Sequence, residues 1–396
     1  MSEPWDLVVV GAGPAGSAAA LAALRLDPEA RVLLLDRADF PRDKACGDGV
    51  APHAIDVLDD LGLPGLVDDH RPVSRLHLGA VRGPSVTGDM RRPARVVPRA
   101  VLDARIRSGA LAAGAVPDRR TVRGLLAPQR DAAVLDLVDV PRGRALPGSP
   151  TGSSGSVRAK VVVAADGAQS AVRRSLGLPR NRPGHLALAL RGYAPVRDDL
   201  VHQQRIVFAD RDWPAYAWSF PVGDGRANVG YGEVLREGRP LDRARLLQRL
   251  EQLLPGTTDG GSAWRGHHLP LSSDRPRQPD GRVLLVGDAL SLINPMTGEG
   301  IYYALLSGAC AGAAAVGRGD PGRTYRSMLR RRLGTHLRHT SAVAALARVP
   351  AVVPAGLRAA GRDPAVFDDL VELGLGRGLL SGRALRGTVA GLAARR

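Results

Sequence analysis

The chain of 396 residues is 44% hydrophobic, carries a formal net charge of +16 and contains two cysteines. This length and apolar content predict a globular protein of one large or two smaller domains and exclude a disordered chain. Two cysteines exclude a disulfide framework, and no residues have the spacing of metal ligands, so we expect no metal site. The basic residues, nearly all arginines, are spread along the chain without an aromatic-rich basic motif, so nucleic acid is not an expected partner. Their charge indicates either attraction to an anionic membrane surface or simply a solvated arginine-rich surface.

The N-terminal segment has the pattern of a strand, a tight turn and a helix. An apolar run over residues 7–10 is typical of a strand buried in a parallel sheet, and residues 15–26 form an alanine-rich helical stretch. Between them, Gly11, Gly13 and Gly16 have the G-x-G-x-x-G spacing, which allows a tight turn, close approach to a pyrophosphate and close packing of helix on strand. A second apolar strand, residues 31–35, ends on Asp36, where a carboxylate can bind a ribose hydroxyl. The unit therefore predicts a dinucleotide site.

The following segments alternate between loops, helices and strands. A glycine-rich loop containing Cys46 spans residues 40–49, and a helix is expected over 54–61. Strand-like pieces over 73–97 precede an amphipathic helix from 98 to 114. Two strands, 134–140 and 157–165, flank a linker rich in Gly, Ser and Pro at 141–156, which we interpret as a hairpin tip.

The C-terminal half begins with strand-like runs and ends in helices. Residues 185–268 contain runs such as 204–208 and 227–232 and one amphipathic helix over 241–254, which indicates an inserted antiparallel lobe. A buried strand, 281–289, and a small-residue helix up to 316 return to the first domain, and basic, apolar helices interrupted at Pro350 and Pro354 complete the chain. We predict an α/β fold with a discontinuous Rossmann-type domain (1–180 and 270–323), an inserted antiparallel-sheet substrate domain (181–269) and a C-terminal helical segment (324–396).

Three segments far apart in the chain together resemble FAD enzymes of the p-hydroxybenzoate hydroxylase type. They are the glycine fingerprint, the Asp166-Gly-x-x-Ser-x-x-Arg173 segment and Gly287-Asp-Ala289. A carboxylate at a strand end, as at Asp288, can accept hydrogen bonds from ribityl hydroxyls, and a helix beginning near Gly298 would direct its N-terminal amides at the flavin. The resemblance implies that the Rossmann-type domain binds FAD. The cofactor contacts expected from the pattern and the resemblance are Gly11, Gly13, Pro14, Ala15, Gly16, Asp36, Arg37, Lys44, Cys46, Gly47, Arg99, Asp166, Gly167, Gly287, Asp288, Pro295, Gly298, Gly300 and Ile301.

Further stretches resemble the geranylgeranyl reductase family of FAD-dependent oxidoreductases. Lys44-Ala-Cys-Gly-Asp-Gly49 is similar to the cysteine–glycine loop of that family, and Pro214-Ala-Tyr-Ala-Trp-Ser-Phe-Pro221 is similar to its Tyr-x-Trp-x-Phe-Pro motif. Asn294-Pro-Met-Thr-Gly-Glu-Gly-Ile301 completes the match. The Cys-Gly-Asp-Gly form resembles bacterial members that reduce the isoprenoid chain of menaquinone more than archaeal lipid reductases. The resemblance implies a reductase that saturates prenyl C=C bonds in geranylgeranyl lipids or in the side chain of menaquinone.

The residues of these motifs leave alternatives open. Tyr216, Trp218 and Phe220 alternate with period two on one expected strand, so they form either core packing or a wall that binds an apolar substrate chain. We favour the wall, because aromatics make up only 4% of the chain. Cys46 is either a buried small hydrophobe or a site residue beside the flavin, and we favour the site role. Glu299 would either orient the loop near the flavin or cap the next helix.

Saturation of an isolated alkene requires a hydride at one carbon and a proton at the other. Aromatic faces can stabilise the positive charge that develops on the alkene, and a dry pocket strengthens this effect. Cys46, Tyr216 and Trp218 are therefore the catalytic candidates, with Cys46 or Tyr216 on the proton route. His267 and His268 are expected at the surface, and Cys310 in helix packing.

Two other classes of function share parts of the pattern. A flavin-dependent monooxygenase or halogenase acting on a small aromatic or natural product would have the same FAD motifs. The paired Trp-x-Trp motif of halogenases is missing, since Tyr216 occupies the first position. A non-catalytic flavoprotein that binds a lipid or a partner through its basic C-terminal helices is the third possibility.

The sequence also bears on partners and location. No expected strand after the first is followed by a G-x-G-x-x-G motif that would form a stable NAD(P)H site, so NAD(P)H would bind transiently or a ferredoxin would serve as electron donor. The basic, apolar tail, with three arginines at 330–332, would dock on a membrane, cover the substrate lobe or form a dimer contact, and the oligomeric state stays open. Neither a signal peptide nor a membrane-spanning apolar run is visible, which predicts a cytoplasmic protein that can bind the inner face of the cell membrane peripherally.

Overall fold

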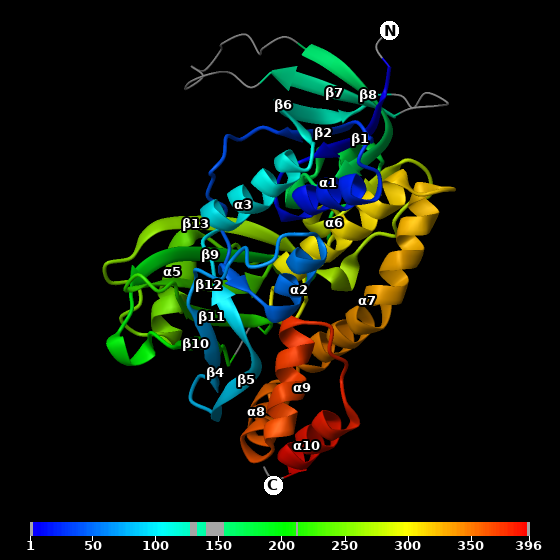
Figure 1. The fold of residues 1–396 in the computed structure, drawn as a ribbon. Helices are drawn as coiled ribbons and strands as arrows, with labels where there is room; N and C mark the ends of the chain where they lie inside the picture. The colour runs from blue at the N-terminus through cyan, green and yellow to red at the C-terminus, as the bar shows by residue number, and fades with distance from the viewer. Residues whose placement is uncertain (1–2, 127–132, 140–153, 211–212, 394–396) are drawn as a thin grey trace.

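The computed structural model describes residues 3–126, 133–139, 154–210 and 213–393, and most of the expected hairpin tip at 141–156 lies outside these ranges. Two β-sheets dominate the molecule, one near the N-terminus and one in the middle, while helices run down one side to the C-terminus (Figure 1). The predicted α/β fold with a Rossmann-type domain, an antiparallel sheet and a C-terminal helical segment is confirmed.

The first sheet has six strands and a parallel centre. It contains β1 (Trp5–Val10), β2 (Val32–Asp36), β6 (Val116–Leu125), β7 (Ala133–Asp139), β8 (Ser154–Ala164) and β14 (Val283–Leu285). Strands β2, β1, β8 and β14 lie side by side in parallel, and β7 pairs antiparallel with both β6 and β8. The Val and Leu runs of β1, β2 and β8 in this centre are buried, as is typical of strands inside a parallel sheet.

Helix α1 (Pro14–Leu26) packs unusually closely on α6 (Ile301–Val316) against this sheet. A Cβ atom added at Gly308 would lie 2.1 Å from the carbonyl oxygen of Ala15, and one added at Gly312 would lie 2.0 Å from that of Ala19. Glycines on α6 therefore allow backbone contact between the two helices. Helix α3 (Arg99–Ala112) also packs on α1, and α2 (Pro52–Asp60) and α4 (Ala171–Ser175) are shorter.

The second sheet has eight strands in the order β13-β9-β12-β11-β10-β4-β5-β3. Their bounds are β3 (Gly49–Val50), β4 (Pro72–Ala80), β5 (Ser85–Val96), β9 (Leu186–Pro195), β10 (Gln203–Phe208), β11 (Ala215–Pro221), β12 (Arg226–Val234) and β13 (Ser262–Pro270). All neighbours are antiparallel except β4 and β10.

The second sheet also contains strands from outside the predicted substrate domain at 181–269. Strands β3, β4 and β5 come from residues 49–96, which the predicted boundaries place in the FAD-binding domain. They join because β4 pairs with β10, with Arg75 opposite Gln203 and Ala80 opposite Phe208. Local sequence pattern identifies a strand but not such a distant partner, and the division into domains stays a prediction.

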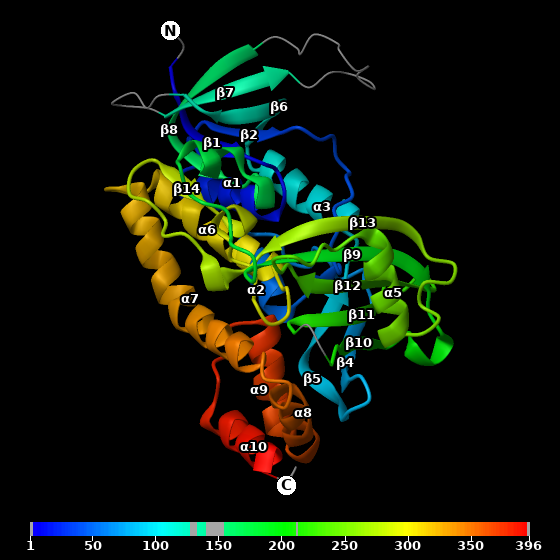
Figure 2. The same ribbon diagram turned by 180° about the vertical axis from the view of Figure 1, so that it is seen from behind.

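Helices cover both faces of the second sheet. Helix α5 (Arg243–Leu253) covers one face, and the opposite face packs against α8 (Val352–Arg362) and α9 (Pro364–Leu375), which follow the long α7 (Pro321–Leu346) (Figure 2). Helix α10 (Gly382–Ala393) packs on α8 and α9. Leu357 of α8 and Phe367 of α9 belong to one apolar cluster with Leu76 and Ile206 of the sheet. The C-terminal segment therefore covers the substrate lobe, which was one of the three expected arrangements. Pro354 does not break a helix, because it lies in the first turn of α8.

Candidate active site

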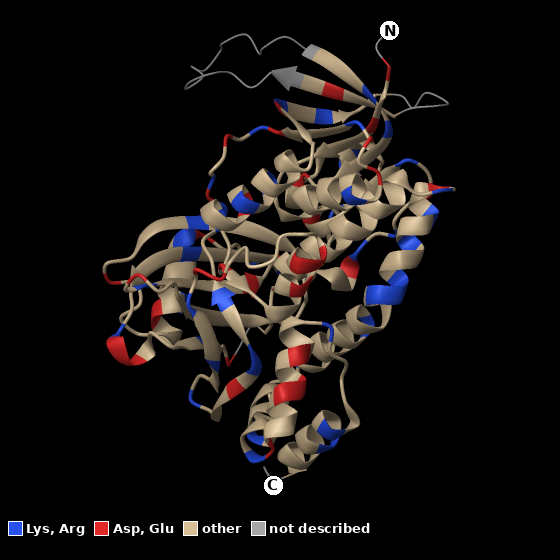
Figure 3. Ribbon diagram, viewed as in Figure 1, with Lys and Arg blue, Asp and Glu red and all other residues tan. Residues whose placement is uncertain are grey.

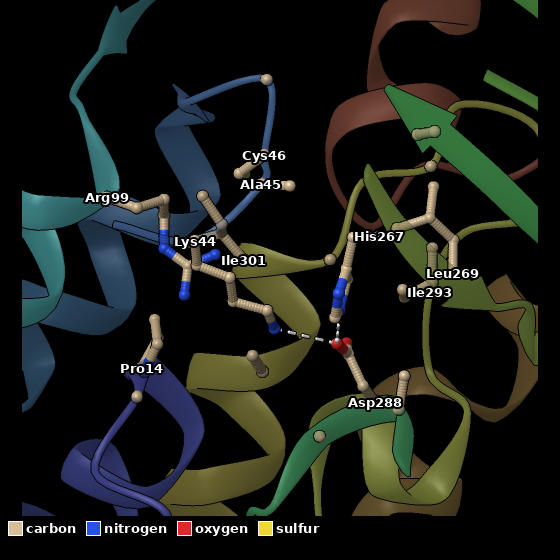
Figure 4. A pocket seen from close by; sticks show the side chains of 18 of the residues that line it. Pro14, Lys44, Ala45, Cys46, Arg99, His267, Leu269, Asp288, Ile293 and Ile301 are labelled. Atoms are coloured by element: carbon tan, nitrogen blue, oxygen red, sulfur yellow. Dashed lines mark hydrogen bonds and ion pairs between the residues drawn. The ribbon is translucent and has the colours of Figure 1, made fainter. Parts of the chain in front are cut away.

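A cavity of about 860 Å³ lies between the two sheets. The strand ends of the first sheet, the loop around Cys46, residues 293–301 and one face of the second sheet line it. Figure 4 shows side chains from these separate segments facing one another across the cavity.

The glycine fingerprint forms one end of the cavity. Gly11 has a positive φ of 99°, and a Cβ atom there would lie 2.4 Å from the carbonyl oxygen of Ala165. A Cβ atom at Gly16 would lie 1.8 Å from the carbonyl oxygen of Gly11, so this glycine serves packing and does not line the cavity. Asp36 does line it, and its carboxylate accepts a hydrogen bond of 2.8 Å from the backbone N–H of Ala12. The N-terminus of α1 therefore opens into the cavity with a carboxylate beside it.

The Asp166 segment joins the other two motifs. One carboxylate oxygen of Asp166 accepts hydrogen bonds from the N–H groups of Ala171 (2.7 Å) and Val172 (3.2 Å), which caps α4. Its other oxygen is buried without a hydrogen-bond partner in the described part of the chain, and burial raises the pKa of Asp166. Arg173 donates to the hydroxyl of Ser291 at 2.7 Å and so ties this motif to the turn after Asp288.

A cluster of three charged or titratable side chains lies deeper in the cavity. The Nζ of Lys44 is 3.1 Å from Oδ2 of Asp288, and Nε2 of His267 is 3.6 Å from the same oxygen (Figure 4). Burial alone would raise the pKa of Asp288, but Lys44 and His267 hold it well below its usual value. The expectation of a surface position for His267 was wrong. Alternation along β13 turns His267 and Leu269 toward the cavity, where burial lowers the pKa of His267.

Arg99 supplies a fixed positive charge next to Cys46. Its guanidinium makes two hydrogen bonds, of 2.6 and 2.8 Å, to the buried carboxylate of Asp103. Burial alone would lower the pKa of Arg99, but Asp103 holds it above its usual value, so the guanidinium stays charged. Burial raises the pKa of the Cys46 thiol, and the charge of Arg99 opposes this rise.

The aromatic strand β11 forms a wall of the cavity. Tyr216, Trp218 and Phe220 all line it from one face of the strand. A Cβ atom added at Gly230, opposite Trp218 on β12, would lie 2.2 Å from the indole ring, so glycine makes room for the ring. The hydroxyl of Tyr216 donates a hydrogen bond to the carbonyl oxygen of Thr297, and burial raises the pKa of Tyr216.

The compartment next to this wall is mostly apolar. Five further strands of the second sheet present small or aliphatic side chains to the compartment at alternate positions. Helices and loops close the compartment on the side opposite the sheet. These apolar lining residues are Leu76, Ala187, Ala189, Ile206, Val234, Leu269, Leu271, Ile293, Met296 and Leu375. Leu375 comes from α9, so the C-terminal segment contributes directly to the cavity.

A buried hydrogen-bond network holds the Cys46 loop on the second sheet. Asp48, fully buried and with a positive φ of 60°, accepts hydrogen bonds from the hydroxyl of Tyr193 and from the amide of Asn228. The same amide donates to the carbonyl oxygen of Cys46 at 2.8 Å, and its oxygen accepts from Nε1 of Trp218 at 2.9 Å. This network was not predicted from the sequence. The Asp in the Cys-Gly-Asp-Gly loop was visible, but nothing local identifies Asn228 as its partner.

The predicted site residues come together with two exceptions. All of the expected cofactor and substrate residues line the cavity apart from Gly16 and Gly287. Gly287 has a φ of 52°, and its N–H donates to Ser307, so it shapes the strand end instead. Glu299 caps α6 by accepting a hydrogen bond of 2.9 Å from the N–H of Tyr302 and also lines the cavity.

The arrangement fits a long dinucleotide such as FAD. The glycine-lined N-terminus of α1 and the carboxylate of Asp36 suit the adenosine and pyrophosphate end, and the unpartnered oxygen of Asp166 suits a donor from the ligand. Asp288 and the N-terminus of α6 suit the ribityl chain and the electron-rich edge of a flavin.

Comparisons with known proteins support FAD as the cofactor and identify the family. A family model described as an FAD binding domain matches residues 5–191. Menaquinone reductase of Mycobacterium tuberculosis is 33% identical over 89% of this chain and 86% of its own length, and digeranylgeranylglycerophospholipid reductase 1 of Methanopyrus kandleri is 34% identical over 83% and 84%. The structure of a geranylgeranyl bacteriochlorophyll reductase-like protein from Thermoplasma acidophilum covers 99% of this chain and 96% of its own, with a TM-score of 0.78 and 19% identity. The flavin-dependent brominase Bmp2 is similar in fold at a TM-score of 0.71 and 16% identity, over 99% and 98% of the chains.

The fold, the three nucleotide motifs and the cavity between the sheets define an FAD-dependent oxidoreductase. Within that class, relatives that are more than 30% identical over most of the chain identify the family more finely than similarity of fold does. The chain belongs to the geranylgeranyl reductase family.

Proposed function

We propose that this enzyme saturates C=C bonds in the prenyl chain of a quinone or lipid, with menaquinone as the first candidate. The observation that carries the proposal is the apolar compartment beside the aromatic wall of Tyr216, Trp218 and Phe220, which adjoins the expected flavin position. Two small side chains of the sheet, Ala187 and Ala189, line the compartment and leave room for a methyl-branched chain. The relatives named above as reductases of menaquinone and of a geranylgeranyl lipid support the same substrate class.

Bound FAD would supply the hydride, and the protein would bind and orient the alkene. Gly11, Gly13 and Asp166 would hold the nucleotide and pyrophosphate, and Asp288 the ribityl chain. The aromatic faces of β11 would stabilise positive charge developing on the alkene in a pocket that excludes water. Cys46, in the loop that Asn228 holds beside Trp218, would contact the substrate or the flavin.

Product analysis tests this function directly. Holoenzyme reduced under anaerobic conditions should convert menaquinone or a geranylgeranyl lipid into products heavier by about two mass units per saturated bond, as detected by mass spectrometry. Ala189→Leu should abolish this conversion by filling the compartment without changing the flavin absorption spectrum, whereas Ala189→Ser, which alters volume little, should retain it. No mass gain with any prenyl substrate would reject the proposal, and a hydroxylated or halogenated small aromatic would favour the alternative class.

The electron donor is NAD(P)H or a reduced ferredoxin in this proposal. Each can be added to the oxidised holoenzyme without oxygen while flavin absorbance is followed. The physiological donor should bleach the flavin within the turnover time of the enzyme.

We further propose that the C-terminal helices bind the cytoplasmic face of the membrane peripherally. Within the described residues, no helix combines the length and apolar character needed to cross a bilayer. Leu385 and Val389 on α10 are 47% and 56% exposed, and Arg383 and Arg386 lie beside them on the exposed part of the same helix. Basic residues also follow the exposed side of α7 (Figure 3). Apolar residues flanked by arginines on a helix are typical of an interfacial anchor.

Flotation with anionic liposomes tests this attachment. Replacing Leu385 and Val389 together by serine should reduce the bound fraction several-fold, because each exposed aliphatic side chain contributes about 1 kcal/mol on insertion. Leu26→Ser at the far end of the molecule is the matched control, since Leu26 is 64% exposed. Equal flotation of all three proteins would reject the anchor.

A further inference from the structure

We propose that Glu299 is the catalytic acid of this enzyme and delivers the proton to the prenyl double bond. The proposal rests on the reductase function proposed above. From the sequence, Tyr216 or Cys46 was the expected proton donor, and Glu299 was interpreted as a loop or cap residue.

The turn over residues 294–300 places Glu299 in the cavity wall. The carbonyl oxygen of Glu299 accepts a hydrogen bond of 2.9 Å from the N–H of Asn294, and Gly298 adopts a positive φ of 69°. The carboxyl group is oriented by the N–H of Tyr302, which donates to its Oε1 at 2.9 Å. The next residues begin α6, so the acid stands where the helix N-terminus meets the apolar compartment.

The aromatic wall adjoins this turn directly. A Cβ atom added at Gly298 would lie 3.1 Å from the hydroxyl oxygen of Tyr216, and that hydroxyl donates to the carbonyl oxygen of the preceding residue, Thr297. A prenyl chain lying against Tyr216 would therefore lie next to Glu299.

The other acids of the cavity are less suited to proton delivery. The phenol proton of Tyr216 is engaged by the carbonyl of Thr297, and burial raises the pKa of Tyr216 further from neutrality. Burial likewise raises the pKa of the Cys46 thiol, and Lys44 is paired with Asp288. An efficient general acid has a pKa near the working pH.

The surroundings of Glu299 bring its pKa close to the working pH. Burial raises its pKa to about 7, although the backbone N–H groups of Tyr302 and Ile301 and the charge of Arg99 act in the opposite direction. The titratable groups that face it are Arg99 from α3, Cys46 from the loop, Tyr216 from β11 and Tyr303 from α6. Near neutral pH about half of the molecules would carry the proton.

The step balances in atoms and electrons. The two electrons of the alkene π bond and a hydride from reduced flavin form two new C–H bonds, one at each carbon. The hydride supplies one hydrogen, and the O–H bond of Glu299 breaks to supply the other as a proton. The carboxylate is protonated again by water, and the oxidised flavin is reduced again by a nicotinamide or ferredoxin donor.

Holoenzyme carrying Glu299→Gln tests the assignment, because glutamine keeps an acceptor for the N–H of Tyr302 but has no acidic proton. Single-turnover saturation of menaquinone should slow by about 10²- to 10⁴-fold, while reduction of the bound flavin by its donor stays within about twofold. The wild-type rate should fall above about pH 7, and this dependence should be lost in the variant. Glu237→Gln, the same change at an exposed glutamate, is the matched control and should behave as wild type.

Infrared difference spectra give a second readout that needs no turnover. A protonated carboxyl band that titrates near pH 7 should be present in wild-type holoenzyme and missing in Glu299→Gln. An unchanged rate and pH profile in the variant, or an unchanged band, would overturn the assignment. If the glutamine variant fails to fold, Glu299→Asp should slow saturation while keeping the pH dependence, and an unaltered rate would equally overturn it. Wild-type enzyme that saturates no prenyl substrate would instead reject the proposed function, so the two failures are distinguishable.

Discussion

Asn228→Ala should loosen the Cys46 loop from the second sheet and destabilise the protein markedly. Asn228 is fully buried and makes three hydrogen bonds, to Cys46, Asp48 and Trp218, of 2.8, 2.8 and 2.9 Å. Each such bond contributes about 1 kcal/mol net, and each buried group left without a partner costs about 1–3 kcal/mol. Since Asp48 keeps Tyr193 as a donor, we expect a total loss of about 3–5 kcal/mol.

Urea unfolding of the holoenzyme, followed by tryptophan fluorescence, measures this loss. Single-turnover saturation should slow in parallel, because the loop that carries Cys46 would no longer be held beside Trp218. Asn228→Asp is the comparison variant. Its first oxygen can still accept from Trp218, but its second oxygen faces two acceptors, so it should be as unstable as Asn228→Ala at neutral pH. Acid should restore part of the stability, because the protonated carboxyl has one O–H donor where the amide has two N–H donors. A free energy of unfolding for Asn228→Ala within about 0.5 kcal/mol of wild type would refute the structural role of the network.

Two further substitutions test the aromatic wall and the ion pair of the cavity. Gly230→Ala should cost about 3 kcal/mol in urea unfolding, because its Cβ would lie 2.2 Å from the ring of Trp218 and 2.4 Å from the carbonyl oxygen of Leu190. Gly232→Ala, whose nearest contact would be 3.4 Å, should fold normally. Equal stability of the two variants would contradict this packing. Although burial alone would raise the pKa of Asp288, Lys44 holds it below the usual 3.8, so the stability that the carboxylate contributes is complete above that pH and is lost as the pH falls below it. The stability difference between wild type and Asp288→Asn should therefore narrow as the pH falls from about 4 to about 2, and a constant difference would argue against the ion pair.

Local pattern was sufficient for the parts of the fold that depend on sequence neighbours. The strand, turn and helix around Gly11 follow from spacing, because a Cβ atom at Gly16 would lie 1.8 Å from the carbonyl oxygen of Gly11, five residues earlier. The common face of the aromatic residues of β11 follows from period two, and the cap at Glu299 was one of two interpretations of its position just before the expected helix.

Other features depend on partners distant in sequence. His267 was misplaced because its surroundings come from Lys44 and Asp288, although alternation with Leu269 contained a usable signal. Strand β4 joins the second sheet through β10, more than a hundred residues later, and no local rule specifies that pairing. The raised pKa of Glu299 likewise arises from burial by the assembled cavity.

The placement of α8, α9 and α10 affects how the chain folds during translation. These helices are translated after both sheets, yet α8 and α9 cover the face of the second sheet that carries Leu76 and Ile206, and Leu375 closes part of the cavity. A nascent chain can fold its nucleotide-binding sheet while its apolar compartment is still open to water. A polypeptide chain terminated before these helices would therefore retain the flavin motifs but expose an apolar surface. We expect such a chain to aggregate or be degraded and to show no partial activity.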